Sequence, residues 1–213
     1  MSAAPCSGTG SRAEAQRDRI LCAALKCFIE DGFHGASMAR IAETAQMSAG
    51  LMYRYFENKN AIVLGIIARQ LEQSRANLRQ LHSTNNVAAG LIAAFERWCQ
   101  RDSNTMNPAL FLEISVEATR NPPLAAALRD FDASMRDELY TWLTRPRTEG
   151  GIGLPAGVAG ERALALQFFI DGLAMRSARE PDLDRDQLRA AVQDMVDKVT
   201  RQPDIAAVQQ KEA

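Results

Sequence analysis

The chain has 213 residues, of which 46% are apolar and 24% are charged, and its formal net charge is −1 at pH 7. These values are ordinary for a globular protein and exclude a disordered or collagen-like chain. The longest apolar runs are shorter than the roughly 20 residues of a membrane-spanning helix, and the first residues hold no apolar stretch of a secretory signal. We therefore expect a cytoplasmic protein without a membrane partner, in which residues 1–11 form a disordered tail.

The charges are divided unevenly along the chain. Residues 1–80 hold ten Lys and Arg against seven Asp and Glu, whereas residues 81–213 hold fifteen against nineteen. This mild excess of positive charge favours a nucleic-acid partner at the N-terminal end.

Hydrophobic periodicity predicts helices almost throughout the chain, beginning with residues 14–31. Gly32 is suited to the backbone conformation that ends a helix. Ser37 and Ser48 each precede a short helical pattern and are good N-caps, and Asn58 is expected to cap a much longer helix. Two short helices joined by a tight turn, between longer helices, are typical of a helix-turn-helix, although any helical hairpin shares this layout.

The rest of the chain continues the helical pattern. Further helices are expected up to residue 82, over 86–100, 108–120 and 121–143, and over 161–179 and 184–201. The glycine-rich segment 148–161 is predicted to be a loop. Because no segment alternates as a strand does, the sequence predicts an all-α fold.

Catalysis has little support in the sequence. Neither of the two histidines, His34 and His82, is followed or preceded by other residues at the spacing of a metal site or a catalytic triad. The chain also lacks the glycine-rich motifs that bind nucleotide phosphates. We therefore expect no enzyme activity, no metal and no cofactor.

The short helix that follows Ser48 is predicted to have two different faces. A helical wheel places Leu51, Met52 and Tyr55 on one side and Ala49, Gly50, Tyr53 and Arg54 on the other. An exposed helical glycine costs about 1 kcal/mol, so Gly50 is best explained by another surface that comes close to it. Tyr53, one turn later, can donate a hydrogen bond to a phosphate oxygen.

The neighbouring helix starts offer two further anion sites. Lys59 is expected at the first helical position after Asn58, where a cation is unfavourable unless an anion binds the free backbone N–H groups. Ser37 and Arg40 form a similar pair at the preceding helix start. A solvated helix face is the alternative for each residue alone, but together they suit the backbone of a DNA duplex.

Residues 17–71 resemble the DNA-binding domain of the tetracycline-repressor (TetR) family of bacterial transcriptional regulators. The resemblance rests on "RILCAALKCFIEDGFHGAS", "MARIAETAQMS" and "AGLMYRYFENKNAIV", in the order and spacing of the family. It implies a three-helix DNA-binding domain over residues 12–60 and a larger helical ligand-binding and dimerisation domain over 61–213. The DNA contacts that it implies are Ser48, Ala49 and Gly50 at the groove, Tyr53, Tyr55 and Lys59 on phosphates, and Ser37 and Arg40 in support.

Two residues depart from the pattern of this family. Gln46 occupies a turn position at which the family usually has glycine, so we expect some backbone strain there. Ala49 stands where lysine is frequent, which removes one charged contact to DNA.

The C-terminal half is similar to the family in "EATRNPPLAAAL" and "FFIDGLAMRSAREP". The resemblance implies a homodimer formed through the last two long helices, and a small-molecule effector. Glu113 and Glu117 could bind a cationic ligand, or form a solvated helix edge. Candidate effector-binding residues, which suit an apolar or aromatic ligand but are also explained by core packing, are Trp98, Met106, Phe111, Phe131, Met135 and Phe168. Candidate dimer-interface residues are Asp171, Leu188, Val192, Met195 and Val199.

We therefore expect a ligand-responsive, dimeric transcriptional regulator, most simply a repressor, that binds a near-palindromic operator in double-stranded DNA and is released by its effector. One alternative is a helical small-molecule-binding protein without DNA-binding activity. Another is a helical enzyme whose active site leaves no local motif.

Overall fold

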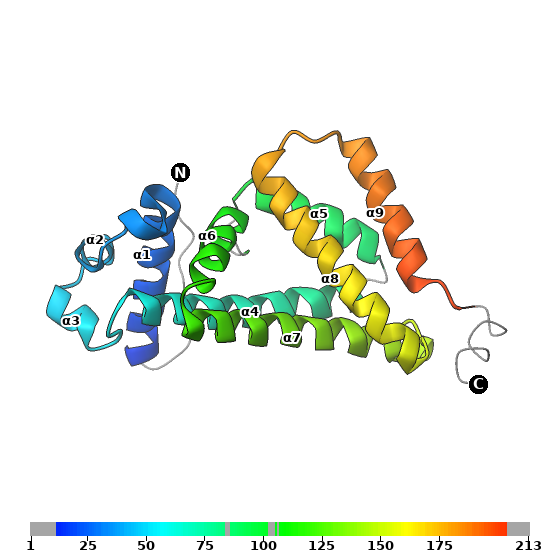
Figure 1. The fold of residues 1–213 in the computed structure, drawn as a ribbon, viewed down its shortest axis with the longest axis horizontal. Coiled ribbons are helices and arrows are strands. Elements are labelled where there is room, and N and C mark those ends of the chain that lie inside the picture. The colour runs from blue at the N-terminus through cyan, green and yellow to red at the C-terminus, as the bar shows by residue number, and fades with distance from the viewer. Residues whose placement is uncertain (1–11, 84–85, 102–104, 106, 204–213) are drawn as a thin grey trace. The chain divides into compact units, whose positions relative to one another are not determined.

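The structure is a computed structural model that describes residues 12–83, 86–101, 105 and 107–203 (Figure 1). These residues form helices and connecting turns, with no strand among them. The α-helices are α1 (Arg12–Gly35), α2 (Met38–Thr44), α3 (Ala49–Tyr53), α4 (Lys59–Ser83), α5 (Val87–Cys99), α6 (Pro108–Ala118), α7 (Pro122–Thr144), α8 (Ala156–Arg179) and α9 (Arg185–Thr200), and a short 3₁₀ turn spans Arg147–Glu149. Within these described segments, no helix is both long and apolar enough to cross a membrane. The predicted all-α class is confirmed, whereas residues 1–11 lie outside the described part.

Side-chain caps occur at the three helix starts where the sequence predicts them. Ser37 and Ser48 each accept a hydrogen bond from the backbone N–H three residues later, at 3.1 and 3.2 Å. Asn58 does the same at 2.9 Å. These bonds satisfy N–H groups that have no partner inside the helix, and so they determine where α2, α3 and α4 begin.

The beginning of α8 differs from the prediction. We expected a loop over 148–161, but α8 starts at Ala156 and includes Gly157 and Gly160. Ala159, between these glycines, is completely buried. Burial of this face in the tertiary structure outweighs the low helix propensity of the two glycines.

Packing divides the chain into two units. The first comprises the described parts of Met1–Glu72 and Asp102–Phe131, and the second comprises those of Gln73–Arg101 and Asp132–Ala213. The long helices α4 and α7 each contribute to both units. The first unit therefore contains α6 and the start of α7 in addition to the N-terminal helices.

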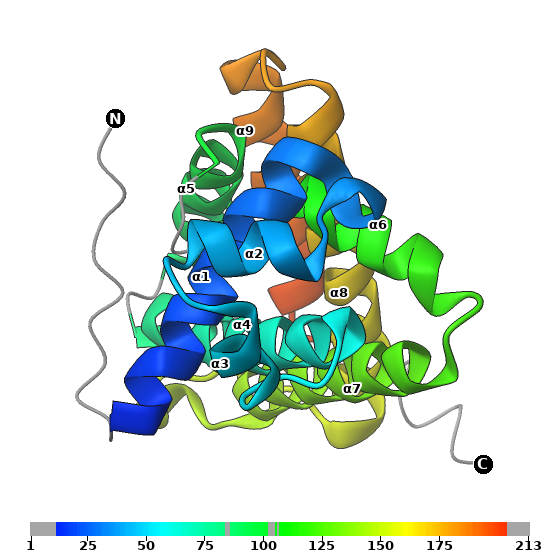
Figure 2. The ribbon, with the colours of Figure 1, turned by 90° about the vertical axis from the view of Figure 1, so that its left-hand side faces the viewer.

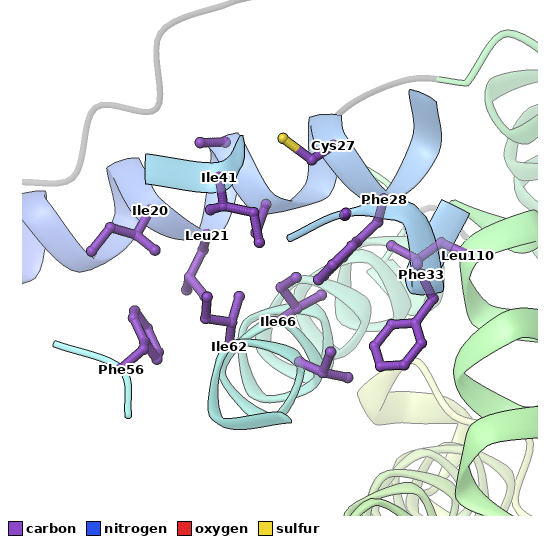
Figure 3. Close-up of a cluster of buried hydrophobic side chains, with 14 of the residues drawn as sticks. Ile20, Leu21, Cys27, Phe28, Phe33, Ile41, Phe56, Ile62, Ile66 and Leu110 are labelled. Carbon is purple, nitrogen blue, oxygen red and sulfur yellow. The ribbon is translucent and has the colours of Figure 1, made fainter. Parts of the chain in front are cut away.

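The core of the first unit joins the helix-turn-helix to α6. Figure 3 shows Phe28 of α1, Ile41 of α2 and Ile66 of α4 directed towards one another, with Leu110 of α6 beside them. Each of these side chains is at most 2% exposed. The core of the first unit therefore includes side chains of α6 as well as those of the N-terminal helices, and both α2 and α6 pack on α1.

The core of the second unit is built around α5, α8 and α9, which pack against one another (Figure 1). Leu188, Val192 and Val199 of α9 were expected at a dimer interface, but they are at most 4% exposed within the single chain. The apolar face of α9 is thus covered by its own unit. This burial leaves these three residues little surface for a partner subunit, while Met195 is half-buried beside them.

Candidate nucleic-acid interface

The turn between α2 and α3 holds a strained backbone at Gln46. Its φ is 52°, in the left-handed region that favours glycine. The Gln46 N–H donates to Glu43 O and the Met47 N–H donates to Ala42 O, both at 2.9 Å. These two bonds form a Schellman motif, so the strain predicted from a non-glycine residue at this turn is confirmed.

Two arginines of α1 hold the backbone at either end of α3. Arg19 Nη2 donates to Gln46 O before α3, and Arg17 Nη1 donates to Tyr55 O after it, each at 3.1 Å. The Arg17 guanidinium also lies 4.5 Å from the centroid of the Phe56 ring. These two roles were not predicted, because the only signal for them in the sequence is the excess of basic residues near the N-terminus.

The backbone of α3 can be followed in Figure 2. Exposure along this helix follows the two predicted faces. Met52 is completely buried, whereas Tyr53 is 54% exposed. The other core-side residues, Leu51 and Tyr55, are half-buried, and the remaining outer residues, Ala49, Gly50 and Arg54, are exposed. The outer face therefore presents a small surface near the start of α3, followed by a phenol and a guanidinium.

Intramolecular packing does not require a glycine at position 50. A Cβ placed on Gly50 would meet no atom within 4 Å. At Gly65 of α4, in contrast, a Cβ would lie 3.0 Å from Leu21 Cδ2 and 3.2 Å from Phe56 Cε1. Gly65 thus has an internal reason for lacking a side chain, and Gly50 has none within the described chain.

Arg40 lies at the start of α2, close to three carboxylates. Its guanidinium is 3.4 Å from Glu43, 3.6 Å from Asp31 and 3.9 Å from Glu30. The hydrogen bond to Glu43 and the charge of Asp31 raise the pKa of Arg40. Exposed pairs of this kind contribute little to stability, so a phosphate could replace them, but in this structure Arg40 is paired within its own unit.

The side chain of Lys59 points towards the protein rather than away from it. Its ammonium donates to Phe33 O at 2.7 Å and to Ala36 O at 3.2 Å. Burial lowers the pKa of Lys59, and the negative charge of Glu117 opposes that shift. We expected this ammonium and the backbone N–H groups at the start of α4 to point towards the same phosphate. In the structure the ammonium is bound to backbone carbonyl groups instead.

The expected effector-binding residues fall into separate groups. Phe111 and Phe131 form a tilted aromatic pair in the first unit, with ring centroids 6.1 Å apart. Trp98 and Met135 are half-buried against the core of the second unit. Phe168 is 66% exposed on α8, and Met106 lies outside the described residues.

An exposed stripe runs along α8 and contains Phe168, Asp171, Gly172 and Met175. Phe168 is 66% and Met175 is 38% exposed, and a Cβ on Gly172 would meet nothing within 4 Å. Their spacing of i, i+3, i+4 and i+7 places them on one face. Although Asp171 is exposed as a residue, partial burial of its carboxyl group and the nearby charge of Asp132 raise its pKa to about 6.

Two family models match the chain, and together they span most of it. Residues 20–66 match the family described as bacterial regulatory proteins of the tetR family. Residues 87–201 match the C-terminal domain of BetI-type transcriptional repressors.

The chain is also similar to characterised and solved regulators. It is 34% identical over 169 residues to the HTH-type transcriptional regulator UidR of Escherichia coli K12, covering 77% of this chain and 83% of UidR. It is 24% identical over 196 residues to the HTH-type transcriptional repressor AcnR of Corynebacterium efficiens, covering 92% and 98%. The solved structure of Salmonella enterica GusR superimposes with a TM-score of 0.67 at 25% identity, covering 88% of this chain and 98% of that one.

Proposed function

Because the chain belongs to the TetR family of bacterial regulatory proteins, and is therefore a DNA-binding transcriptional regulator rather than an enzyme, we propose that it is a dimeric repressor released from DNA by a small molecule. The observation that carries the proposal is the outer face of α3. Ala49, Gly50, Tyr53 and Arg54 are exposed there, while Met52 anchors the helix in the core.

The proposed DNA contacts follow from this exposure. Ala49 and Gly50 come closest to the base edges in the major groove, because they carry almost no side chain. Tyr53 and Arg54 donate to phosphate oxygens from the same face. The exposed hydroxyls of Ser37 and Ser48 lie at neighbouring helix starts, where backbone N–H groups also favour an anion. Tyr55 packs its ring inward and offers its hydroxyl at the edge of this surface.

The repressor assignment has support from the comparisons. The family model over residues 87–201 describes transcriptional repressors, and AcnR is named a repressor. A repressor binds its operator when no effector is present. Because bacterial DNA lies in the cytoplasm, the repressor acts there. We propose a near-palindromic operator, because a two-fold dimer presents its two reading helices about 34 Å apart.

We propose that the dimer forms through the exposed stripe of α8. Large apolar side chains such as Phe168 and Met175 are unfavourable in water, and a second copy of the chain would cover them. Gly172 between them leaves room for a close approach of the partner helix. Asp171 lies at the edge of the stripe and is placed to make a hydrogen bond across such an interface.

We propose that the effector is a small apolar or aromatic molecule. The half-buried pair Phe111 and Phe131 supports this class, because two tilted rings bind a third ring or an alkyl group favourably. The effector lowers DNA affinity if it binds the DNA-free arrangement of the dimer more tightly than the DNA-bound one.

Footprinting of the purified protein on the DNA that flanks its own gene tests the proposal. We expect protection of one near-palindromic site that survives competition by unrelated DNA at moderate salt. Weak protection spread evenly over the fragment would overturn the operator proposal and would favour a small-molecule-binding protein that no longer reads DNA.

A further inference from the structure

The connection between α1 and α2 is held from two sides by charged side chains. The backbone N–H of Phe33 donates to Glu113 Oε2 of α6 at 2.6 Å. The carbonyl oxygen of the same residue accepts a bond from Lys59 Nζ of α4 at 2.7 Å. One residue of the connection is thus bound by an anion at its N–H and by a cation at its C=O.

The backbone conformation explains why this connection needs outside partners. Gly32 has φ 72° and ψ 166°, a combination that is essentially restricted to glycine, and it interrupts α1 one turn before its end. The interruption frees the peptide groups around Phe33 from the regular helix pattern. A hydrogen bond to a charged side chain is stronger than one between neutral groups. Unlike a bond to water, it also holds these peptide groups in one position.

Lys59 extends the same contact to the start of α2. Its ammonium donates to Ala36 O at 3.2 Å, and Ala36 directly precedes the N-cap residue Ser37. It also lies 4.5 Å from the centroid of the Phe33 ring, which is 4% exposed. Lys59 therefore links the end of α1, the start of α2 and the start of α4.

Both carboxylates of α6 are used on this side of the helix. Glu117, one turn after Glu113, has its carboxylate 3.6 Å from His34 Nε2 and 3.2 Å from Arg120 Nε. The sequence left open whether Glu113 and Glu117 bind a cationic ligand or form a solvated edge. In the structure their carboxylates contact the end of α1 instead.

We propose that Glu113 and Lys59 are positioning residues for DNA binding, which act by fixing Phe33 and hence the orientation of α2 and α3, and that Lys59 does not bind a phosphate through its ammonium. The proposal rests on the DNA-binding function proposed above. It assigns a role in DNA reading to Glu113, which lies in α6, outside the helix-turn-helix.

Salt dependence distinguishes a positioning residue from a phosphate contact. Each phosphate contact that is lost lowers the slope of log K against log salt by about one. We expect Glu113→Gln and Lys59→Met to weaken operator binding by about tenfold, with the slope of the wild type. Arg54→Met, which removes an exposed guanidinium from the outer face of α3, is the matched comparison and is expected to reduce the slope by about one.

Hydrogen exchange of the free protein provides a readout that needs no operator. We expect faster exchange of the backbone N–H groups of residues 33–41 in Glu113→Gln, with unchanged exchange in α5 and α8. Circular dichroism at the binding temperature confirms that each variant is folded, and a general loss of stability would instead accelerate exchange throughout. Glu113→Asp, which keeps the charge on a shorter side chain, should recover part of the affinity.

Three results would overturn the proposal. They are a slope reduced by about one in Lys59→Met, wild-type operator affinity in Glu113→Gln, and unchanged exchange over residues 33–41 in that variant. If the wild-type protein binds no operator, the proposed function fails, and the exchange measurement still decides whether Glu113 fixes the connection.

Discussion

Gly50 stands on an exposed helix face, where glycine is unfavourable for the free protein and has no packing role. A Cβ at this position would contact no described atom. The same is true of Gly160 in α8. The two glycines therefore have equally open surroundings and differ only in the surface on which they lie.

Substitution of each glycine by alanine therefore separates stability from DNA binding. We expect Gly50→Ala and Gly160→Ala each to raise the free energy of unfolding by roughly 0.5–1 kcal/mol, because alanine loses less backbone entropy in a helix. Gly50→Ala should also weaken operator binding, since its methyl group would hold α3 away from the base edges in the groove. Urea unfolding and operator titration measure the two effects. Equal operator affinity of the two variants would contradict the proposed groove contact.

Gln46 shows strain of the opposite kind, because its side chain is tolerated at a backbone conformation that favours glycine. We expect Gln46→Gly to stabilise the protein by about 1 kcal/mol, which is the cost of a Cβ in the left-handed region. Gln46→Ala keeps the Cβ and should leave the stability close to that of the wild type. Thermal unfolding compares the three proteins, and a glycine variant no more stable than the alanine variant would show that the turn is not strained.

At the scale of whole helices, α7 and α8 meet through polar groups that are not fully satisfied. The buried Gln167 of α8 donates from Nε2 to the backbone carbonyl of Asp132 in α7 at 3.2 Å. Its Oε1 has no hydrogen-bond partner in the described structure. Partial burial also raises the pKa of Asp132, against the effect of Arg136. Because Asp132 in turn raises the pKa of Asp171, ionisation of Asp171 opposes the packing of these two helices.

This contact predicts a pH dependence of stability. The pKa of Asp171 is about 6 in the folded chain and 3.8 for the unperturbed group, so the folded state binds more protons between these values. The stability contributed by protonated Asp171 is complete below about pH 4 and is lost as the pH rises through 6. We expect Asp171→Asn to be more stable than the wild type at pH 7, with a difference that disappears near pH 4 in urea unfolding.

Asp132→Asn tests the cause of this dependence. Removal of the Asp132 charge should bring the pKa of Asp171 closer to its ordinary value and narrow the pH range over which stability falls. An advantage of Asp171→Asn that is the same at pH 4 and pH 7 would show that ionisation of Asp171 is not responsible.

For the whole molecule, the exposed stripe of α8 predicts the state of assembly. We expect the wild-type protein to sediment as a dimer and Phe168→Glu to sediment as a monomer, because the interface would have to bury an unpaired carboxylate. Val116→Glu is the control, since Val116 is also exposed, at 58%, but lies on α6. Operator binding by the Phe168 variant should weaken as well, because two linked reading heads bind more tightly than one. A dimer that survives in Phe168→Glu would place the interface elsewhere.

The sequence by itself determined the features that depend on neighbouring residues. Ser37, Ser48 and Asn58 cap helices within three residues of themselves, and the two faces of α3 follow from its helical periodicity. The strain at Gln46 was likewise predicted, because the resemblance implies a glycine at this turn position. Local chemistry of this kind, with the resemblance that its motifs carry, was sufficient for the fold class and for most of the exposed surface of α3.

The tertiary structure decided the features that depend on residues far apart in the chain. The apolar stripe of α9 showed that one face is buried, but periodicity cannot say whether its own unit or another subunit covers it. The direction of Lys59 depends on Phe33, 26 residues earlier, which also binds Glu113, 80 residues later in the chain. A charged side chain binds the polar groups that lie nearest to it in space. The distances between these groups are established only when α1, α4 and α6 pack together.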